Sequence, residues 1–252
     1  MLALSELKRM AAREGVPQAI VEKDYALSVA LKVLAGSELA QRCVFKGGTA
    51  IRKAYFKEAR YSEDLDFTAI NMEKGDCLRL LRAALEGKTT EGILFADIEE
   101  IRTAAGLKAA VKYLGPLGYA QRIRFDFSFR DNLAEKPEVR GLIDSYSIGP
   151  AKMQVMGIEE IFAEKLHALG SRSAPRDLYD VWFLLGKGVK VDSKVLERKF
   201  DFYNEKFDAK KAIDNARKSE EEWTRDLQPL LKMLPDYEKV EREVEKGLDL
   251  LL

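Results

Sequence analysis

A double glycine followed closely by two aspartates is the feature that most constrains this chain. Gly47 and Gly48 precede Asp64 and Asp66, and residues 62–68 alternate polar and apolar side chains with a period of two. That period predicts a strand, so both aspartates leave the same face of it. Neighbouring carboxylates repel each other unless a cation lies between them, and such oxygen ligands suit Mg²⁺ or Mn²⁺. The alternative is a solvated strand edge.

A second predicted strand adds a third carboxylate. Residues 123–130 alternate in the same way, and Asp126 lies on their polar face. If this strand pairs beside residues 64–67, three carboxylates share one face and can hold two divalent ions, as phosphoryl-transfer sites do. The simpler alternative is that Asp126 only forms an ion pair with Arg124 or Arg130.

The glycine turn is suited to binding phosphate. An apolar run at residues 43–46 predicts a strand that ends at Gly47 and Gly48, which let a phosphate approach the backbone. We expect Thr49 to cap a helix over residues 50–58, whose first N–H groups favour an anion. The spacing is not that of a Walker A loop. The alternative is an ordinary strand-to-helix turn.

The segment around this turn is basic. Residues 42–60 hold six basic residues against one acidic residue, a net charge of +5. We interpret Lys57 as part of a solvated helix face. Arg52, Lys53 and Arg60 are the candidates for holding a triphosphate or a nucleic-acid backbone.

The composition excludes several classes of protein. The 252 residues hold 42 Lys and Arg against 42 Asp and Glu, which argues against coating nucleic acid through bulk positive charge. A single histidine, His167, excludes a His-based zinc site and leaves a Ser-His-Asp triad only if it supplies the base. Cys43 and Cys77 lack metal-like spacing and are predicted to be reduced thiols. No apolar stretch approaches the roughly 18 residues of a membrane helix, so we expect a soluble, cytoplasmic protein.

The order of the predicted elements indicates an α+β fold. Strands lie before about residue 157 and helices after it. We therefore expect a mixed-sheet core with flanking helices over 1–157 and a helical C-terminal domain over 158–252. The predicted helices of the core are 5–14, 17–35, 50–58 and 73–90, and its predicted strands are 43–46, 62–68, 93–101, 109–114, 123–130 and 152–156.

Two segments together resemble a known family. Lys46-Gly47-Gly48-Thr49-Ala50-Ile51-Arg52-Lys53, followed by Arg60-Tyr61-Ser62-Glu63-Asp64-Leu65-Asp66-Phe67, is similar to the first motif of the AbiEii/AbiGii nucleotidyltransferase-like toxins. Thr49 stands where that motif usually has Ser. Upstream, Glu22-Lys23-Asp24-Tyr25 also resembles the family. Residues 164–169 and 175–181 resemble the family's later Lys and Arg-Asp-x-x-Asp motifs, and the match spans roughly 20–185.

The resemblance implies a nucleotidyltransferase fold and transfer of NMP from an NTP. It assigns the metal, Mg²⁺ or Mn²⁺, to Asp64, Asp66 and Asp126, contact with the nucleotide phosphates to Lys165, and completion of the later motif to Asp180. The remaining nucleotide-binding candidates are Gly47, Gly48, Thr49, Arg52, Lys53, Arg60, Ser62, Arg176 and Asp177.

The resemblance also implies partners. Many members of the family are toxins neutralised by a separately encoded antitoxin, and some transfer nucleotides to the 3′ end of tRNA. Three alternatives stay open: an NTP-binding regulatory module without transfer, a transferase acting on a small molecule or protein, and an interaction protein whose helical part binds an antitoxin. From the residues alone, Lys165 could form only a surface pair with Glu164, and Asp177 could be only a first-turn acid.

Overall fold

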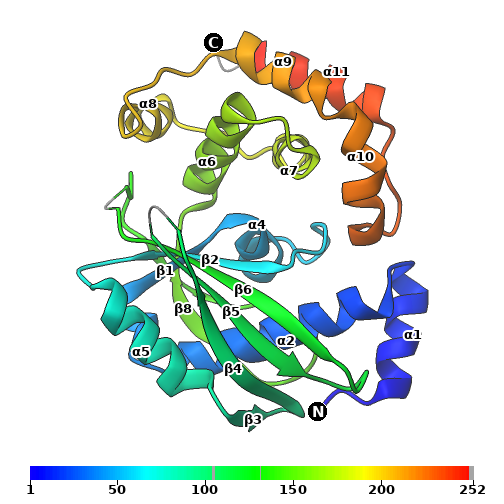
Figure 1. Ribbon diagram of the computed structural model, residues 1–252. Helices are drawn as coiled ribbons and strands as arrows, with labels where there is room; N and C mark the ends of the chain where they lie inside the picture. Colours follow the sequence, from blue (N-terminus) through cyan, green and yellow to red (C-terminus); the bar gives the residue numbers. More distant parts are fainter. Residues whose placement is uncertain (104–105, 131, 250–252) are drawn as a thin grey trace. The chain divides into compact units, whose positions relative to one another are not determined.

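Alternating apolar side chains build one mixed sheet in the N-terminal part of the chain (Figure 1). Within residues 1–103, 106–130 and 132–249, which the computed structural model describes, the sheet has eight strands in the order β3-β4-β5-β6-β2-β1-β8-β7. The pairs β2–β6 and β1–β8 are parallel, and the other neighbours are antiparallel. The strands are β1 (Cys43–Lys46), β2 (Asp64–Ala69), β3 (Lys88–Thr90), β4 (Ile93–Ile101), β5 (Leu107–Leu114), β6 (Ala120–Ser128), β7 (Glu138–Gly141) and β8 (Lys152–Val155).

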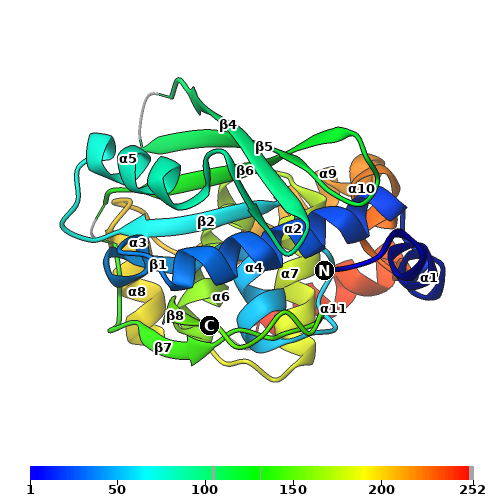
Figure 2. The same ribbon diagram turned by 90° about the horizontal axis from the view of Figure 1, so that it is seen from below.

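One face of the sheet is packed and the other is polar. Phe67 of β2 stacks on Phe125 and Phe127 of β6, and all three rings are buried. Helices α2 (Gln18–Ala35) and α5 (Lys74–Leu85) pack on this face (Figures 1 and 2). The other helices of this part are α1 (Leu4–Glu14), α3 (Leu39–Arg42) and α4 (Gly47–Ala50), which continues as a π-helical turn over Ile51–Tyr55.

The chain divides into two compact units. The N-terminal unit is Met1–Asp131 with Pro137–Val155, and the C-terminal unit is Asn132–Lys136 with Met156–Leu252. The helices of the C-terminal unit are α6 (Ile158–Ser171), α7 (Pro175–Gly186), α8 (Ser193–Asp201), α9 (Ala209–Lys218), α10 (Glu220–Leu227) and α11 (Tyr237–Asp249), with a 3₁₀ turn at Gln228–Leu230. Among the residues described, no helix is both long enough and apolar enough to cross a membrane.

A buried carboxylate explains why residues 132–136 belong to the C-terminal unit. Glu160 of α6 accepts hydrogen bonds from the backbone N–H groups of Ala134, at 2.8 Å, and Glu135. Its carboxylate also lies 2.6 Å from the Lys199 ammonium of α8, which donates to the carbonyl of Asn132. The segment thereby supplies the hydrogen bonds that a buried charge needs.

The α+β prediction is confirmed, with local corrections. The helix expected over 73–90 ends at Leu85, because Gly87 has a φ of 71° and turns the chain into β3. The helix expected over 50–58 begins at Gly47 and ends at Tyr55. Strand β7 was not predicted, since this short, largely exposed strand has no apolar alternation.

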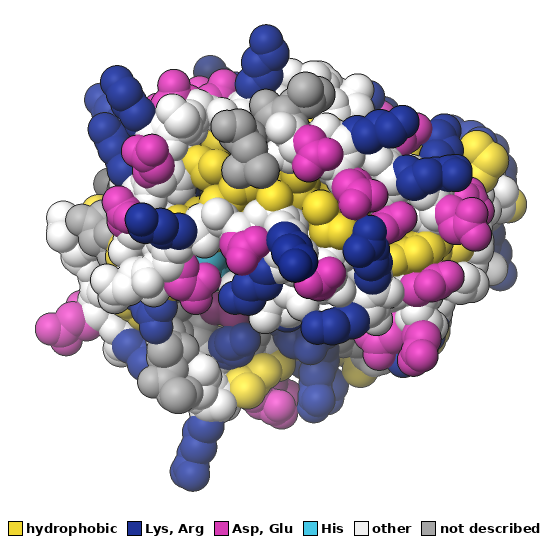
Figure 3. All heavy atoms as spheres, turned by 90° about the horizontal axis from the view of Figure 1, so that it is seen from above, with side chains coloured by type: hydrophobic (Ala, Val, Ile, Leu, Met, Phe, Trp, Pro, Cys, Tyr) yellow, Lys and Arg dark blue, Asp and Glu magenta, His cyan; other side chains and the backbone are white. Residues whose placement is uncertain are grey.

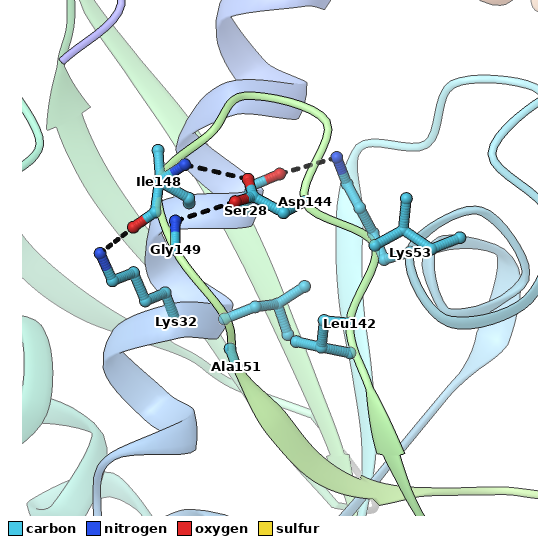
Figure 4. A pocket seen from close by; sticks show the side chains of 10 residues that line it. Ser28, Lys32, Lys53, Leu142, Asp144, Ile148, Gly149 and Ala151 are labelled. Carbon is cyan, nitrogen blue, oxygen red and sulfur yellow. Dashed lines mark hydrogen bonds between the residues drawn. The ribbon is translucent and has the colours of Figure 1, made fainter.

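A buried ion pair joins α2 to the turn that follows the glycines. The Lys53 ammonium lies 2.6 Å from the Asp24 carboxylate, and both side chains are only 2% exposed. Lys53 also donates to Ser28 (Figure 4), and the Tyr146 hydroxyl donates to Asp24 at 2.7 Å. Burial disfavours the charged Asp24, but Lys53 and Arg52 outweigh it and lower the pKa of that carboxyl.

Removing one charge of this pair should strongly destabilise the N-terminal unit. We predict that Lys53→Ala lowers the free energy of unfolding by about 3–5 kcal/mol, because Asp24 then stays buried without its closest cation. Urea unfolding followed by far-UV circular dichroism measures the change. Lys57→Ala is the matched control: its side chain is exposed on the same segment, and we expect a change of less than about 0.5 kcal/mol. Equal effects of the two substitutions would contradict a structural role for the pair.

Candidate active site

The glycine turn lies against the second aspartate of β2. Antiparallel pairing of β1 with β2 places Lys46 opposite Asp66, and Gly47 follows directly. Gly47 has a φ of 77°, and a Cβ atom there would lie 2.3 Å from Asp66 Oδ2. The turn and the Asp-x-Asp strand therefore meet, as the sequence predicts, and only glycine allows this close approach.

The third carboxylate lies beside the second. Parallel pairing of β2 with β6 places Asp66 opposite Asp126 and Asp64 opposite Arg124. Residues at the same level of neighbouring strands point to the same face, so the three aspartates share the polar face of the sheet. The condition for three carboxylates on one face, that these two strands pair, is therefore met.

Two cations neutralise part of this group. Arg124 Nε lies 3.0 Å from Asp64 Oδ1, and Lys108 Nζ of β5 lies 2.9 Å from Asp126 Oδ2. Arg124 therefore pairs with Asp64, and Lys108 pairs with Asp126. Exposed pairs of this kind contribute only about 0–1 kcal/mol, so a ligand of matching charge can replace either partner.

The donor set fits a hard divalent cation in its chemistry. Carboxylate oxygens are the preferred protein ligands of Mg²⁺ and Mn²⁺, and Asp64 and Asp126 keep part of their side chains in solvent. Over the described ranges, however, no three His, Cys, Asp or Glu side chains converge closely enough to hold a metal ion. The aspartates are thus adjacent but not gathered into a preformed cluster.

Thr49 forms a hydrogen bond to strand β2 and does not cap a helix. Its side chain is fully buried, and its hydroxyl donates to the backbone carbonyl of Asp64. Since α4 already begins at Gly47, the expected N-cap is wrong. The bond joins the helical turn to the start of β2, close to the partly buried Ser62.

The basic candidates of residues 42–60 are committed to the fold. Lys53 is buried and forms an ion pair with Asp24. The pocket beside it (Figure 4) has a volume of about 20 Å³, which is too small for a nucleotide. Arg52 donates to the carbonyls of Lys57 and Ala59, and its guanidinium lies 3.8 Å from the centre of the Tyr61 ring.

Arg60 is 5% exposed and donates to the carbonyl of Tyr61. The expectation that Arg52, Lys53 and Arg60 reach a phosphate conflicts with these contacts. The net charge of the segment does not include the acceptors elsewhere in the fold to which these side chains bind.

The later motif forms an ion cluster within the C-terminal unit. Lys165 Nζ of α6 lies 3.0 Å from Asp177 Oδ1 and 2.8 Å from Asp180 Oδ2 of α7, and Arg172 Nε lies 2.8 Å from Asp177 Oδ2. Lys165 keeps 13% of its side chain exposed. Burial disfavours the charged Asp177, but Lys165 and Arg172 lower its pKa to about 2. Asp177 is therefore more than a first-turn acid.

The remaining reactive side chains are packing residues. His167 stacks on Tyr203 with ring centres 3.9 Å apart, and burial lowers its pKa. Cys43 and Cys77 are buried free thiols, and a hydrogen bond between them together with burial raises the pKa of Cys77. The cysteines are therefore free thiols, as the sequence predicts, and His167 packs against an aromatic ring.

One neighbour of the aspartates, Lys108, was not among the predicted site residues. The turn at residues 115–118 could have revealed it, since an antiparallel hairpin there places Lys108 opposite Asp126. Asp24 belongs to the segment 22–25 that resembles the family, but its role as the buried partner of Lys53 cannot be predicted from the pattern, because α2 also carries three other charged residues.

The structure brings a glycine turn against a strand aspartate, with a third carboxylate on the parallel neighbour, which is the arrangement that the sequence predicts for a nucleotidyltransferase. The fold agrees: MenT4, a nucleotidyltransferase toxin from Mycobacterium tuberculosis H37Rv, superposes with a TM-score of 0.79 at 22% identity, covering 100% of this chain and 90% of that one. An antigenic nucleotidyltransferase-like protein from Paracoccidioides brasiliensis gives a TM-score of 0.47 at 16% identity, covering 84% and 94%.

The family follows from the sequence profile. The profile of the nucleotidyltransferase AbiEii toxins of type IV toxin–antitoxin systems matches residues 30–249. The chain therefore belongs to the AbiEii family and is a nucleotidyltransferase. A nucleotidyltransferase toxin of a toxin–antitoxin system implies an NTP substrate and a cognate antitoxin. No curated protein matches the chain.

A side chain at position 47 should disturb the site. We predict that Gly47→Ala costs about 1–2 kcal/mol of stability, because alanine resists a positive φ, and that its Cβ displaces the Asp66 carboxylate. Urea unfolding and nucleotide transfer measure the two effects. Gly75→Ala in α5 is the control, since a Cβ there meets nothing within 4 Å and we expect no loss. Full transfer by Gly47→Ala would contradict the close approach.

The Asp177 cluster should stabilise the C-terminal unit in a pH-dependent way. With a folded pKa of about 2 against 3.8, ionised Asp177 contributes about 2 kcal/mol above pH 4, and the contribution is lost as pH falls through 2. We predict that Asp177→Asn removes it at pH 7 and that the difference from wild type shrinks below pH 4.

Tryptophan fluorescence measures this unit alone, since Trp182 and Trp223, the two tryptophans of the chain, both lie in it. Asp214→Asn, at an exposed position in α9, is the control. A difference that stays constant from pH 7 to pH 2 would refute the assignment.

Proposed function

We propose that this nucleotidyltransferase moves an NMP from an NTP to the 3′ end of tRNA in the cytoplasm, and that a cognate antitoxin restrains it. The observation that carries the proposal is the register that sets Asp66 between Gly47 and Asp126. This register places two features on one surface. The glycine turn lets a phosphate approach the backbone, and the carboxylate oxygens can bind a cation.

In this proposal, the N-terminal unit carries the chemistry. Gly47 and Gly48 face the phosphates of the NTP, and Asp64, Asp66 and Asp126 hold Mg²⁺ or Mn²⁺. Such a cation, when bound, neutralises triphosphate charge and lowers the pKa of an attacking hydroxyl. The acceptor hydroxyl bonds to the α-phosphorus, the bond to the β-phosphate oxygen breaks, and pyrophosphate leaves while the hydroxyl proton passes to solvent. Positioning supplies much of the acceleration.

The C-terminal unit contributes the later motif. We assign Lys165 to the nucleotide phosphates, with Arg176 as a further candidate on α7. Asp177 and Asp180 position the Lys165 ammonium through the two ion pairs of 3.0 and 2.8 Å. Because those carboxylates are nearly fully buried, the ammonium is held in one place before a nucleotide arrives.

A second candidate function is NTP binding without transfer. It is favoured by the ion pairs of Asp64 with Arg124 and of Asp126 with Lys108, which neutralise two of the three carboxylates. A small-molecule or protein acceptor is a further variant of the transferase. Incubation with each labelled NTP, Mg²⁺ and either total tRNA or no RNA separates these possibilities.

Loss of one carboxylate should abolish transfer while the fold survives. We predict that Asp66→Asn lowers label transfer to tRNA by about 100-fold or more, equivalent to about 2.7 kcal/mol of transition-state free energy. Circular dichroism should show an unchanged fold, since Asp66 lies on the polar face.

Asp97→Asn is the matched control, because Asp97 is an exposed aspartate of the same sheet, on β4. We expect it to transfer at the wild-type rate. An Asp66→Asn protein that labels tRNA as fast as wild type would refute the assignment. Binding of NTP by wild type without pyrophosphate release would favour the regulatory alternative.

A further inference from the structure

A hollow lies on the polar face of the sheet, beside Asp64. Its volume is about 650 Å³, within the range of sites that hold small ligands. It is formed within the N-terminal unit by β4, β5, β6 and the start of α2 (Figure 1). The residues that line it are Lys23, Ile101, Ala110, Lys112, Ala120, Gln121, Arg122 and Arg124.

Strand register explains the shape of the hollow. On the polar face, Ala110 lies opposite Arg124 and Lys112 lies opposite Arg122, and Ala120 ends the row on β6. The two alanines form a low apolar floor, and the long cationic side chains stand around it. Gln121 at its edge is held by a hydrogen bond to the buried Glu22.

The lining is cationic. On the face drawn in Figure 3, Lys and Arg side chains are interspersed with Asp and Glu. The hollow has four cations and no acidic side chain in its lining. A local excess of one sign in a chain of zero net charge indicates a binding surface for the opposite charge.

Two of the four cations are available to an anion. Lys23 Nζ lies 3.1 Å from Glu63 in a largely buried pair, and Arg124 pairs with Asp64. Within the described part of the chain, Lys112 has no ion-pair partner. Arg122 lies 3.6 Å from Glu99 with both side chains 62% exposed, and such a pair contributes little. A phosphate can therefore displace Glu99 from Arg122 at small cost.

The position of the hollow separates it from the glycine turn. Gly47 lies against Asp66, whereas the hollow reaches the aspartates through Arg124, which pairs with Asp64. From Arg124 the row of cations continues along β6 and β5, away from Asp126. If the NTP phosphates lie at the glycines, this second anion site faces the carboxylates from another side.

We propose that this hollow holds the phosphodiester backbone of the acceptor RNA, an inference that rests on the proposed nucleotidyl transfer to RNA. Lys112 and Arg122 bind backbone phosphates, and the alanine floor leaves room for a ribose or base. Arg124 joins the hollow to the carboxylates, so a strand bound here ends at the reacting centre.

The test is the double charge reversal Lys112→Glu with Arg122→Glu. Binding of a fluorescent tRNA pool is measured by anisotropy from low to moderate salt, without NTP. We expect the affinity to fall at least about tenfold and the slope of log K against log salt to fall by about 1–2, as the loss of two phosphate contacts predicts. NTP affinity, measured by calorimetry without RNA, should stay within about twofold of wild type.

The matched control is Lys8→Glu with Arg9→Glu, two exposed cations on α1. We expect it to bind tRNA like wild type. If the charge-reversed protein is unstable by circular dichroism, Lys112→Gln with Arg122→Gln replaces it, with a smaller fall in affinity expected. Unchanged tRNA affinity would overturn the proposal, and the hollow would then suit an acidic protein instead. A loss of NTP affinity with tRNA affinity intact would also overturn it and assign the hollow to the triphosphate.

These readouts are independent of transfer. If wild type binds tRNA through the hollow but labels none, the proposed transfer fails and the binding inference stands. If wild type labels tRNA and the double variant still binds and labels it normally, the inference fails and the transfer stands.

Discussion

The buried pair of Asp24 and Lys53 is the interaction on which the N-terminal unit depends. It fixes the helical turn after the glycines to α2. Arg52 pairs with the same Asp24 carboxylate, and the Tyr146 hydroxyl donates a hydrogen bond to it. A buried charge left without its partner is so costly that alternative placements of this turn are excluded. The position of this helical turn places Gly47 beside Asp66. A buried ion pair therefore fixes the geometry of the site on the surface.

The site itself is a product of strand register. A shift of one residue in the pairing of β2 with β6 would move Asp66 away from Asp126 and turn one of the two toward the core. The stacked Phe67, Phe125 and Phe127 on the opposite face oppose such a shift, because it would expose them. Burial of aromatic rings on one face therefore aligns carboxylates on the other. Lys108 and Arg124 reduce the repulsion between these carboxylates and can be displaced by a charged ligand.

Much of the fold was predictable because its signals are local. Period-two alternation identified most strands, and the clustering of strands before helices identified the α+β class. The Asp-x-Asp strand and the glycine turn were likewise readable, since both depend on residues close in sequence. The basic residues of 42–60 were misjudged for the opposite reason. Lys53 finds its acceptor 29 residues earlier, on α2, and no count of neighbouring charges contains that contact.

The sequence by itself determined which chemistry this protein has available: three aspartates on polar strand faces, a turn that only glycine can form beside one of them, and the motifs of its family. Tertiary structure decided which charges are free to use that chemistry. Lys53 and Arg60 are buried and Arg52 is largely buried, and each is bound to acceptors of the fold because an unpaired charge cannot remain in a core. The pairing of β5 with β6 instead places Lys112, Arg122 and Arg124 around one hollow. The location of usable positive charge depends on long-range contacts, and only the folded chain contains those.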